Sequence, residues 1–299
     1  MRHATWTTIE STPTALRLYR YFRRLPERIR RPLAFIAMPR WHLATASVRR
    51  AADGRVLSGP FAGMRMELTQ TSRRQLLGYL LGTQELELRP AIEQIIARGY
   101  RTILNVGAAD GYYAIGLAMK LPGASVVAFE ALPEHHSQLR RAAKANGVAE
   151  RVRLQGFCSA CDLDRELRRA AAPAILVADI EGGEIDLLAP DKINGLRQTD
   201  ILVETHDALV PGVTDILISR FRTTHDIERI WARPRRLSDF PKGVLPRLPL
   251  LLPDTTVELM NERRQGRQQW LFLTAKETAS GAAPSGSRQR RGRNSGDNA

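Results

Sequence analysis

The feature that most constrains the fold of this chain is a regular alternation of short apolar runs with segments of helical spacing. The apolar runs have the length of buried strands and lie at residues 103–106, 125–129, 152–155, 174–178, 200–203, 226–232 and 269–274. The helical segments between them lie at residues 112–121, 133–146, 162–171, 184–188 and 214–221. Strands and helices that alternate through short connections predict an α/β protein with a parallel, doubly wound sheet and right-handed crossovers.

The first of these strands ends in a glycine-bearing turn, Gly107 to Gly111, and a helix-like segment follows at once. A buried strand, a tight turn and a helix N-terminus in this order form a cradle for a nucleotide-like ligand. Glycine suits the turn because a Cβ would obstruct the turn and the approach of the ligand. The spacing is G-x-x-x-G and not the dinucleotide pattern G-x-G-x-x-G. This spacing favours S-adenosylmethionine (SAM) over NAD.

Polar or small residues follow five successive strands of the predicted sheet. They are Asn105, Gly107 and Asp110, then Glu130, then residues 156–158, then residues 179–184, and then residues 204–207. Ligands of open α/β sheets bind outside the carboxyl ends of the strands, so these residues are expected to meet at one site. Glu130 lies about twenty residues after the glycine turn, where a carboxylate can bind both hydroxyls of a ribose.

Three stretches together resemble the class I SAM-dependent methyltransferases, and specifically their FkbM-type group. They are Asn105-Val-Gly-Ala-Ala-Asp-Gly-Tyr-Tyr113, Phe129-Glu130 and Asp179-Ile-Glu-Gly-Gly-Glu184. The resemblance covers roughly residues 100–210, and the D-x-E-G-x-E element is its most specific part. It implies a Rossmann-like, seven-stranded, mostly parallel sheet with helices on both faces and an antiparallel last strand. It also implies methyl transfer to an oxygen of a small molecule or sugar.

The resemblance also implies which residues hold SAM. The turn Gly107, Ala108, Ala109, Asp110 and Gly111 would wrap the methionine part, and Asn105, Tyr112 and Asp179 are further cofactor-binding residues. Glu130 and Ala131 would bind the ribose, and the segment at Cys158 would flank the adenine. Asn105 stands where the group usually has an acid. An amide still forms hydrogen bonds but lacks the charge that favours a cationic ligand, so a non-catalytic SAM-fold binding protein is an alternative.

The methyl group of SAM is already activated, so a methyltransferase has to position the acceptor and exclude water. An alcohol acceptor also loses a proton, for which a base must lie within hydrogen-bond reach. His206 is the first candidate, with Glu204 orienting it, and Asp179 or Glu181 are alternatives. The two acids could instead cap the helix that follows them. All four residues could also bind Mg²⁺, an alternative that we rank below a site without metal.

The net charge of +14 is confined to the two ends of the chain. Residues 1–50 contain eleven Arg against two Glu, residues 279–299 carry +3, and residues 51–278 carry only +2. The basic ends prompt a second hypothesis, a nucleic-acid methyltransferase. The near-neutral centre argues against it. So does the fourth strand, which is followed by Asp179-Ile-Glu-Gly and not by an Asn-Pro-Pro-Tyr-type element.

Residues 14–50 mix Arg with large apolar side chains, and Pro26, Pro32 and Pro39 interrupt them. This pattern predicts short basic amphipathic helices. They could form an arm that contacts a membrane surface weakly, or nucleic acid. Alternatively they could pack on the main domain and keep their Arg in water. The prolines break up a continuous binding face, which favours packing on the main domain.

The chain is expected to divide into four parts. They are a basic helical extension (1–50), a lead-in hairpin with helices (51–99), the methyltransferase domain (100–276) and a disordered basic tail (277–299) with little to bury. Within them, residues 234–253 predict an irregular flap over the carboxyl edge of the sheet. Glu85 is a candidate residue for the roof of the site. Glu262 is expected to lie in a charged hairpin turn before the last strand.

Cysteine content and hydropathy indicate the compartment. Cys158 and Cys161 form a C-x-x-C with neither a second pair nor a His cluster, which favours free thiols over a zinc site or disulfide. No apolar run approaches the ~18 residues of a membrane span. The N-terminus lacks the apolar segment of a signal peptide. These features predict a cytoplasmic protein.

Overall fold

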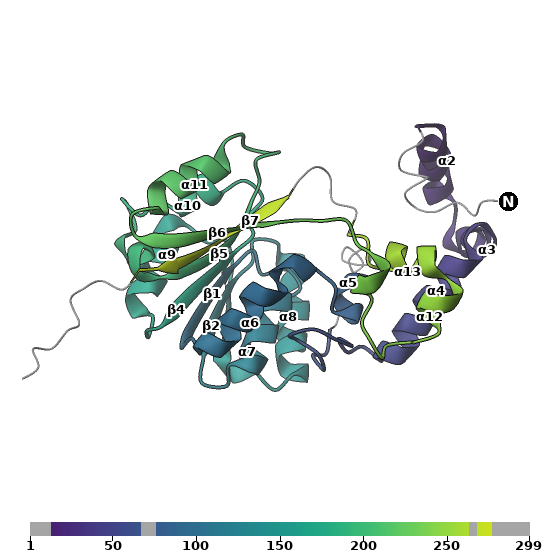
Figure 1. Ribbon diagram of the computed structural model, residues 1–299, viewed down its shortest axis with the longest axis horizontal. Coiled ribbons are helices and arrows are strands. Elements are labelled where there is room, and N and C mark those ends of the chain that lie inside the picture. The colour runs from purple at the N-terminus through teal and green to yellow at the C-terminus, as the bar shows by residue number, and fades with distance from the viewer. Residues whose placement is uncertain (1–12, 67–75, 263–267, 277–299) are drawn as a thin grey trace, which may run out of the picture.

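A seven-stranded sheet forms the centre of the computed structural model, which describes residues 13–66, 76–262 and 268–276 (Figure 1). The strand order is β3-β2-β1-β4-β5-β7-β6. The strands are β1 (Thr102–Val106), β2 (Ser125–Phe129), β3 (Val152–Gln155), β4 (Ala174–Ala178), β5 (Asp200–Thr205), β6 (His225–Trp231) and β7 (Gln269–Ala275). The first five strands are parallel, and β7 runs antiparallel between β5 and β6. The strand prediction is therefore confirmed.

The topology places a ligand crevice beside β1. The chain runs outward from β1 through β2 to β3, and then returns to the other side of β1 with β4. This reversal separates the connections at the carboxyl ends of β1 and β4 and leaves a crevice there. Seven strands with an antiparallel last strand are the arrangement that the sequence resemblance implies. The fold is that of a Rossmann-like class I methyltransferase.

Helices cover both faces of the sheet. On one face lie α6 (Arg89–Arg98), α7 (Tyr112–Lys120) and α8 (Pro133–Ala145). On the other lie α9 (Ala160–Arg169), α10 (Glu184–Leu187) and α11 (Val213–Phe221). The short helical turns η3 (Ala149–Arg151) and η4 (Asn194–Gln198) complete the connections. The central strands β1, β4 and β5 bury both of their faces, which explains their continuous apolar runs, whereas the edge strands β3 and β6 are partly exposed.

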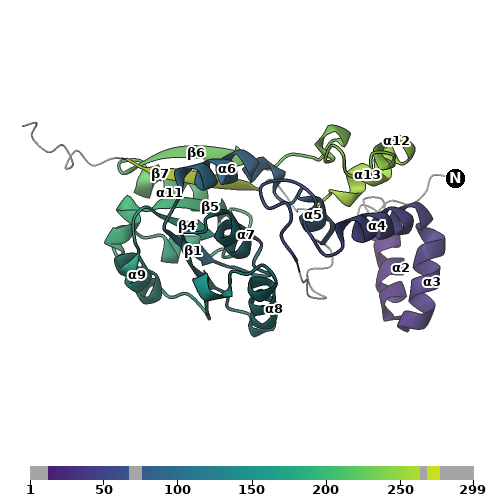
Figure 2. The ribbon, with the colours of Figure 1, turned by 90° about the horizontal axis from the view of Figure 1, so that it is seen from below.

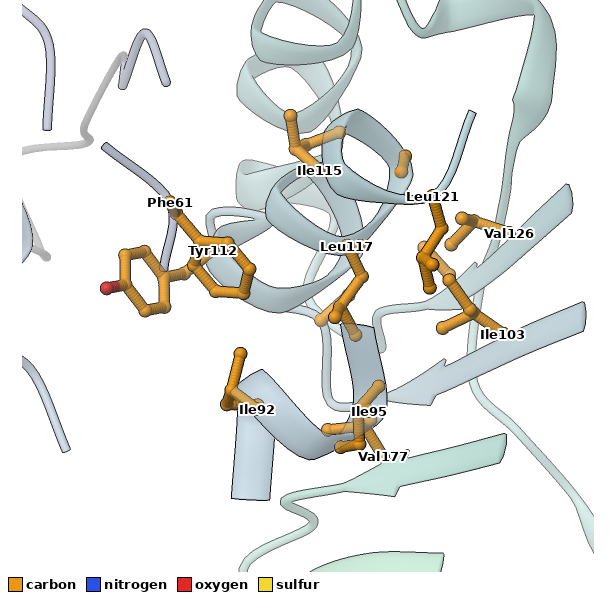
Figure 3. Packing of buried hydrophobic residues seen from close by; sticks show 14 of the residues in the cluster. Phe61, Ile92, Ile95, Ile103, Tyr112, Ile115, Leu117, Leu121, Val126 and Val177 are labelled. Carbon is orange, nitrogen blue, oxygen red and sulfur yellow. The ribbon is translucent and has the colours of Figure 1, made fainter. Parts of the chain in front are cut away.

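The strand side chains alternate between two apolar cores. Ile103 of β1 points into the core with α6 and α7, whereas its neighbour Leu104 belongs to the core on the other face. Figure 3 shows the first core, in which Ile95 of α6 and Leu117 of α7 pack over Ile103. One helix start differs from the prediction. Helix α9 begins two residues early because the Ser159 side chain accepts a hydrogen bond from the Asp162 N–H and forms a capping box.

The lead-in segment packs into the first core. Residues 55–66 form the expected turn in minimal form, with a single antiparallel bridge between Arg55 and Arg65. Its Phe61 is buried against α7, where a Cβ on Gly116 would lie 2.6 Å from the Phe61 ring. Gly116 is thus the small residue that lets this ring approach the helix. The segment continues through α5 (Leu76–Leu81) and η2 (Leu86–Leu88).

A second, smaller core lies beyond the carboxyl ends of the parallel strands. It joins α4 (Pro39–Ala52), α5 and α13 (Pro253–Leu259) through Val48, Leu81 and Leu259. The turn η5 (Leu237–Asp239) and α12 (Leu248–Leu251) belong to the same helical body. Residues 234–253 are largely irregular, as predicted, but include η5 and α12. Phe240, Leu248 and Leu252 pack into the core with α4 and α5, whereas Leu250 and Leu251 are exposed.

The two N-terminal helices differ from the remainder of the extension. Helix α4 buries Ala44, Val48 and Ala52, as expected for an extension that packs on the main domain. Helices α2 (Pro13–Arg24) and α3 (Glu27–Ala37) instead project away from the sheet (Figures 1 and 2). The packing expectation is thus wrong for these two helices.

No helix in the described part of the chain combines the length and the hydropathy required to span a bilayer. The predicted disordered tail at 277–299 lies outside the described residues.

Candidate active site

Two cavities meet at the carboxyl ends of β1 and β4, and Gly107 lines both of them. The larger has a volume of about 560 Å³, is mainly apolar, and includes Glu130, Ala131, Cys158 and Glu181 in its wall. The smaller measures about 50 Å³, and among the predicted residues it is lined by Asn105, Ala108, Ala109, Asp110, Tyr112, Asp179 and Glu204. The structure therefore brings nearly all predicted residues to one place. Gly111 and His206 lie just behind the walls.

The Glu130 carboxylate shapes the glycine turn from the wall of the larger cavity. Its Oε2 accepts a hydrogen bond from the Ala109 N–H at 2.7 Å, and its Oε1 accepts one from the Leu132 N–H at 2.8 Å. Ala109 is held in the left-handed region with φ +43°. A carboxylate has about four lone-pair sites, so Glu130 can also accept hydrogen bonds from the hydroxyls of a ribose.

Position 107 requires glycine for two reasons, namely the close approach of the neighbouring strand and the conformation of its own backbone. Its φ is +78°, and a Cβ at this position would lie 1.7 Å from the backbone oxygen of Asp179. The sequence argument assigned this glycine to the turn and to the close approach of a ligand. The structure shows that the nearest obstacle is the end of β4, whose Asp179 N–H donates to the Val106 carbonyl.

The remainder of the turn is anchored to the helices that surround it. The buried Asp110 carboxylate lies 3.0 Å from Nδ1 of His135 on α8. Gly111 has φ +87° and stands at the start of α7. Tyr112 is packed between Phe61 and Tyr79, with ring centroids 5.1 and 4.7 Å away. The turn is therefore fixed before any ligand binds.

Asn105 offers an acceptor to the smaller cavity. Its Nδ2 donates to the Val177 carbonyl at 3.2 Å, and within the described structure its Oδ1 is buried without a hydrogen-bond partner. A buried polar atom without a partner costs about 1–3 kcal/mol. Because Asn105 lines the cavity, a ligand with an N–H donor, such as the ammonium group of SAM, can satisfy this oxygen.

His206 lies behind the end of β5 among four carboxylates. Its Nδ1 is 2.5 Å from Glu184 Oε1, whereas its Nε2 faces Asp179, Glu181 and Glu204 at 3.5, 3.8 and 3.9 Å. The partner that orients the ring is thus Glu184, and the assignment of this role to Glu204 was wrong. The third acid of the D-x-E-G-x-E element was the available signal. Its side chain turns back to His206 from the first residue of α10.

The carboxylates change the protonation of His206. Burial lowers the pKa of the imidazole, but the hydrogen bond to Glu184 and the charges of Asp179 and Glu204 outweigh it and raise the pKa to about 9. In the free protein the ring therefore carries a proton at neutral pH. It has to lose this proton before it can act as a base.

The same group of residues could hold a divalent metal ion. The ligand atoms of Asp179, Glu181 and His206 all lie within 4.8 Å of one another. Glu184 binds Nδ1 and leaves Nε2 facing the carboxylates, as when a second carboxylate orients a histidine ligand. Imidazole suits Mn²⁺, Fe²⁺ or Zn²⁺ better than Mg²⁺, so the donor set fits Mg²⁺ least.

Side chains from outside the five parallel strands close the smaller cavity. Glu85, Tyr79, Tyr113 and Trp270 line it, and burial raises the pKa of Tyr79 and Tyr113 well above the usual value. The Tyr113 hydroxyl donates to the Glu85 carboxylate. The sequence indicated Glu85 as a roof residue. It missed Tyr79 and Trp270, which have no motif around them, and it assigned no role to Tyr113, although the motif contains it.

Glu262 is a buried partner of this roof, and the remainder of the charged turn expected there lies outside the described residues. Its Oε1 accepts a hydrogen bond from the Glu85 N–H at 2.8 Å. The same carboxylate forms an ion pair with Arg235, which also pairs with Glu87 at 2.6 Å. All three charged side chains are almost fully buried. Residues 232–262 are thereby tied to the roof of the site.

The two cysteines are free thiols, as expected. Burial raises the pKa of Cys158 to about 12, so its thiol is inert and serves as an apolar wall of the larger cavity. Cys161 is exposed on α9. Phe157 stands exposed at the rim of the same cavity, next to Cys158.

Comparisons with known proteins find partial similarities. No model of a known protein family matches the chain. A stretch of 109 residues, 35% of the chain, is 37% identical to the release factor glutamine methyltransferase of Chlorobaculum tepidum and spans 33% of that relative. The structure is similar to an O-methyltransferase from Bacillus cereus in complex with SAH (13% identity, TM-score 0.41, 77% of this chain, 91% of the other). It is also similar to the O-methyltransferase TomG from Streptomyces achromogenes in complex with SAM (16%, 0.40, 76% and 89%).

Proposed function

We propose that the protein is a SAM-dependent methyltransferase that methylates an oxygen of a small molecule or sugar. The observation that carries this proposal is the pair of joined cavities at the ends of β1 and β4. The larger is lined by the ribose-binding candidate Glu130, and the smaller by Asn105, whose Oδ1 has no hydrogen-bond partner in the described structure. The D-x-E-G-x-E element supports the FkbM-type assignment, since two of its acids flank His206 and the third binds it.

The chain offers a separate place for each part of SAM. The apolar wall at Phe157 and Cys158 suits the adenine, and Glu130 suits the ribose hydroxyls. The methionine part would enter the smaller cavity, where Asn105 Oδ1 can accept from its ammonium group. When bound, SAM supplies a methyl group on a positively charged sulfur.

His206 would take the proton of the acceptor. In the free protein its Nε2 is protonated and faces Asp179 and Glu181. A nearby cation disfavours a second positive charge, so the sulfonium of bound SAM would lower the pKa of His206, and Nε2 of His206 could then accept the proton of the acceptor. Glu184 holds the ring during this transfer. Asp179 or Glu181 would serve as the base if His206 does not.

A divalent cation is the alternative occupant of this position. If it binds between Asp179, Glu181 and His206, chelation should abolish turnover, and Mn²⁺ should restore it better than Mg²⁺. Full activity after dialysis against a chelator would leave the base role to His206.

Two other acceptor classes stay open to experiment. The relative from C. tepidum is named for glutamine methylation, which makes a protein side chain one candidate. The basic ends of the chain make nucleic acid the other. The near-neutral centre of the chain argues against nucleic acid, and the match to the relative from C. tepidum spans only 33% of that protein, so we favour a small molecule or sugar.

The test is to incubate the full chain with methyl-labelled SAM and a cell extract, and then to separate small molecules, proteins and nucleic acids. We expect label in the small-molecule fraction and a fall of about a hundredfold or more for His206→Ala. Gly123→Ala, which changes an open surface position, is the control. Label in proteins or nucleic acids would overturn the acceptor class. No labelled product at all would favour a non-catalytic binding protein.

A further inference from the structure

Helix α3 carries an apolar stripe that nothing in the described structure covers. Ile29, Leu33 and Ile36 recur at the spacing of one helix face and are 44%, 43% and 74% exposed. Phe35 lies beside the stripe, and Leu25 precedes it in the connection from α2; both are exposed. Helices α2 and α3 project from the helical body, so the stripe lies far from the sheet (Figure 2). Clustered exposed apolar side chains of this kind mark an interaction site.

The charges around the stripe are almost all positive. Residues 13–50 contain ten Arg, no Lys and a single acid, Glu27. Arg24 and Arg28 are exposed next to the stripe, and Arg40 is exposed just beyond its end. A partner must therefore accept large apolar side chains and many positive charges at the same time.

An anionic membrane surface meets both requirements. Its headgroups attract Arg at about 1 kcal/mol per residue, and its acyl boundary takes up the apolar face of an amphipathic helix. Nucleic acid would satisfy the Arg but not the stripe. Residues 277–299 are unsuited to cover it, since they are basic overall and have only Ala and Pro as apolar residues.

We propose that α2 and α3 dock the protein on anionic membranes. The side chains of Ile29, Leu33 and Ile36 enter the boundary between headgroups and acyl chains, and the flanking Arg bind the anionic headgroups. The exposed Leu250 and Leu251 of α12 belong to the adjoining helical body and add apolar surface there. The surface lies outside both cavities, so docking does not depend on methyl transfer.

Co-sedimentation of the full chain with vesicles tests this proposal. We expect binding to phosphatidylcholine vesicles that contain phosphatidylserine, and little binding to phosphatidylcholine alone. Ile29→Asp/Ile36→Asp and, separately, Arg24→Glu/Arg28→Glu should each weaken binding by about tenfold or more. Ile216→Asp and Arg222→Glu, exposed positions on or just after α11, are the matched controls and should bind as the wild type does.

Circular dichroism decides whether each variant is folded, and the two pairs of substitutions provide independent evidence if one fails to fold. Equal binding to the two vesicle types, or wild-type binding by both folded variants, would overturn the proposal. Binding to duplex DNA or RNA without binding to vesicles would overturn it in favour of a nucleic-acid arm.

Discussion

At the scale of single residues, the site depends on which carboxylate holds His206. Glu184 binds Nδ1 of the ring, so Nε2 faces the cavity side with Asp179 and Glu181. This arrangement sets both the direction and the pKa of the proposed base. The pKa of His206 is therefore raised by buried Glu184 and Glu204 together with Asp179, which lines the smaller cavity.

The first prediction concerns pH. If His206 is the base, kcat/KM should rise with pH and level off above an apparent pKa of about 9, because this ratio reports the free enzyme. Glu184→Gln replaces the charged acceptor with a neutral amide oxygen, which stabilises the protonated imidazole less, so the midpoint should move down toward 6.5. Steady-state rates across the pH range measure both. A wild-type midpoint near 6.5, or one that Glu184→Gln leaves unchanged, would contradict the assignment.

A second prediction concerns Gly107. Gly107→Ala places a Cβ against the Asp179 carbonyl at positive φ, and we expect it to lower the free energy of unfolding by about 2 kcal/mol or more. Gly123→Ala is the matched control, since its Cβ would meet no atom within 4 Å. Urea denaturation of both variants measures the difference. Similar midpoints would show that β1 and β4 can separate without cost.

At the scale of elements, the central strands β1, β4 and β5 were predictable because each is buried on both faces and therefore contains a continuous apolar run. Because each apolar run shows where a strand ends, the residues that follow the strand were predictable as well. The direction in which a side chain points was not predictable. Glu184 is an example, because the turn Asp179-Ile-Glu-Gly-Gly folds back and brings its carboxylate to His206. The role of Gly107 also depended on the register that places Val106 beside Ala178, which the sequence does not reveal.

The third prediction tests the lead-in segment as part of the core. Phe61→Ala should lower the free energy of unfolding by about 3–5 kcal/mol, because the ring is fully buried against α7. Phe35→Ala removes an exposed ring from α3 and should change it by about 0.5 kcal/mol or less. Urea denaturation distinguishes the two. Equal effects would mean that residues 55–66 do not stabilise the sheet domain.

At the scale of the whole molecule, two cores are joined across the roof of the site. Arg235 forms ion pairs with Glu87 and with Glu262. Glu262 in turn accepts a hydrogen bond from the Glu85 backbone N–H. The helical body on α4 is thereby coupled to the smaller cavity. Residues 234–262 have no regular period, so the sequence indicated neither their helices nor this buried ion pair.

The fourth prediction follows from that ion pair. Arg235→Ala leaves two buried carboxylates without their cation and should cost about 3–5 kcal/mol of stability. Arg236→Ala, at the next and exposed position, should cost about 0.5 kcal/mol or less. Because Glu85 loses its support, the KM for the acceptor should also rise in Arg235→Ala. Equal stability of the two variants would show that the helical body is not held through this contact.

Isothermal titration of SAM into the full chain tests the central claim most directly. We expect one site per chain and binding weakened by about tenfold or more in Glu130→Ala, which removes the acceptor for the ribose hydroxyls. Gly123→Ala should bind as the wild type does. The absence of binding heat at millimolar SAM, or unchanged affinity in Glu130→Ala, would contradict the assignment of the two cavities to this ligand.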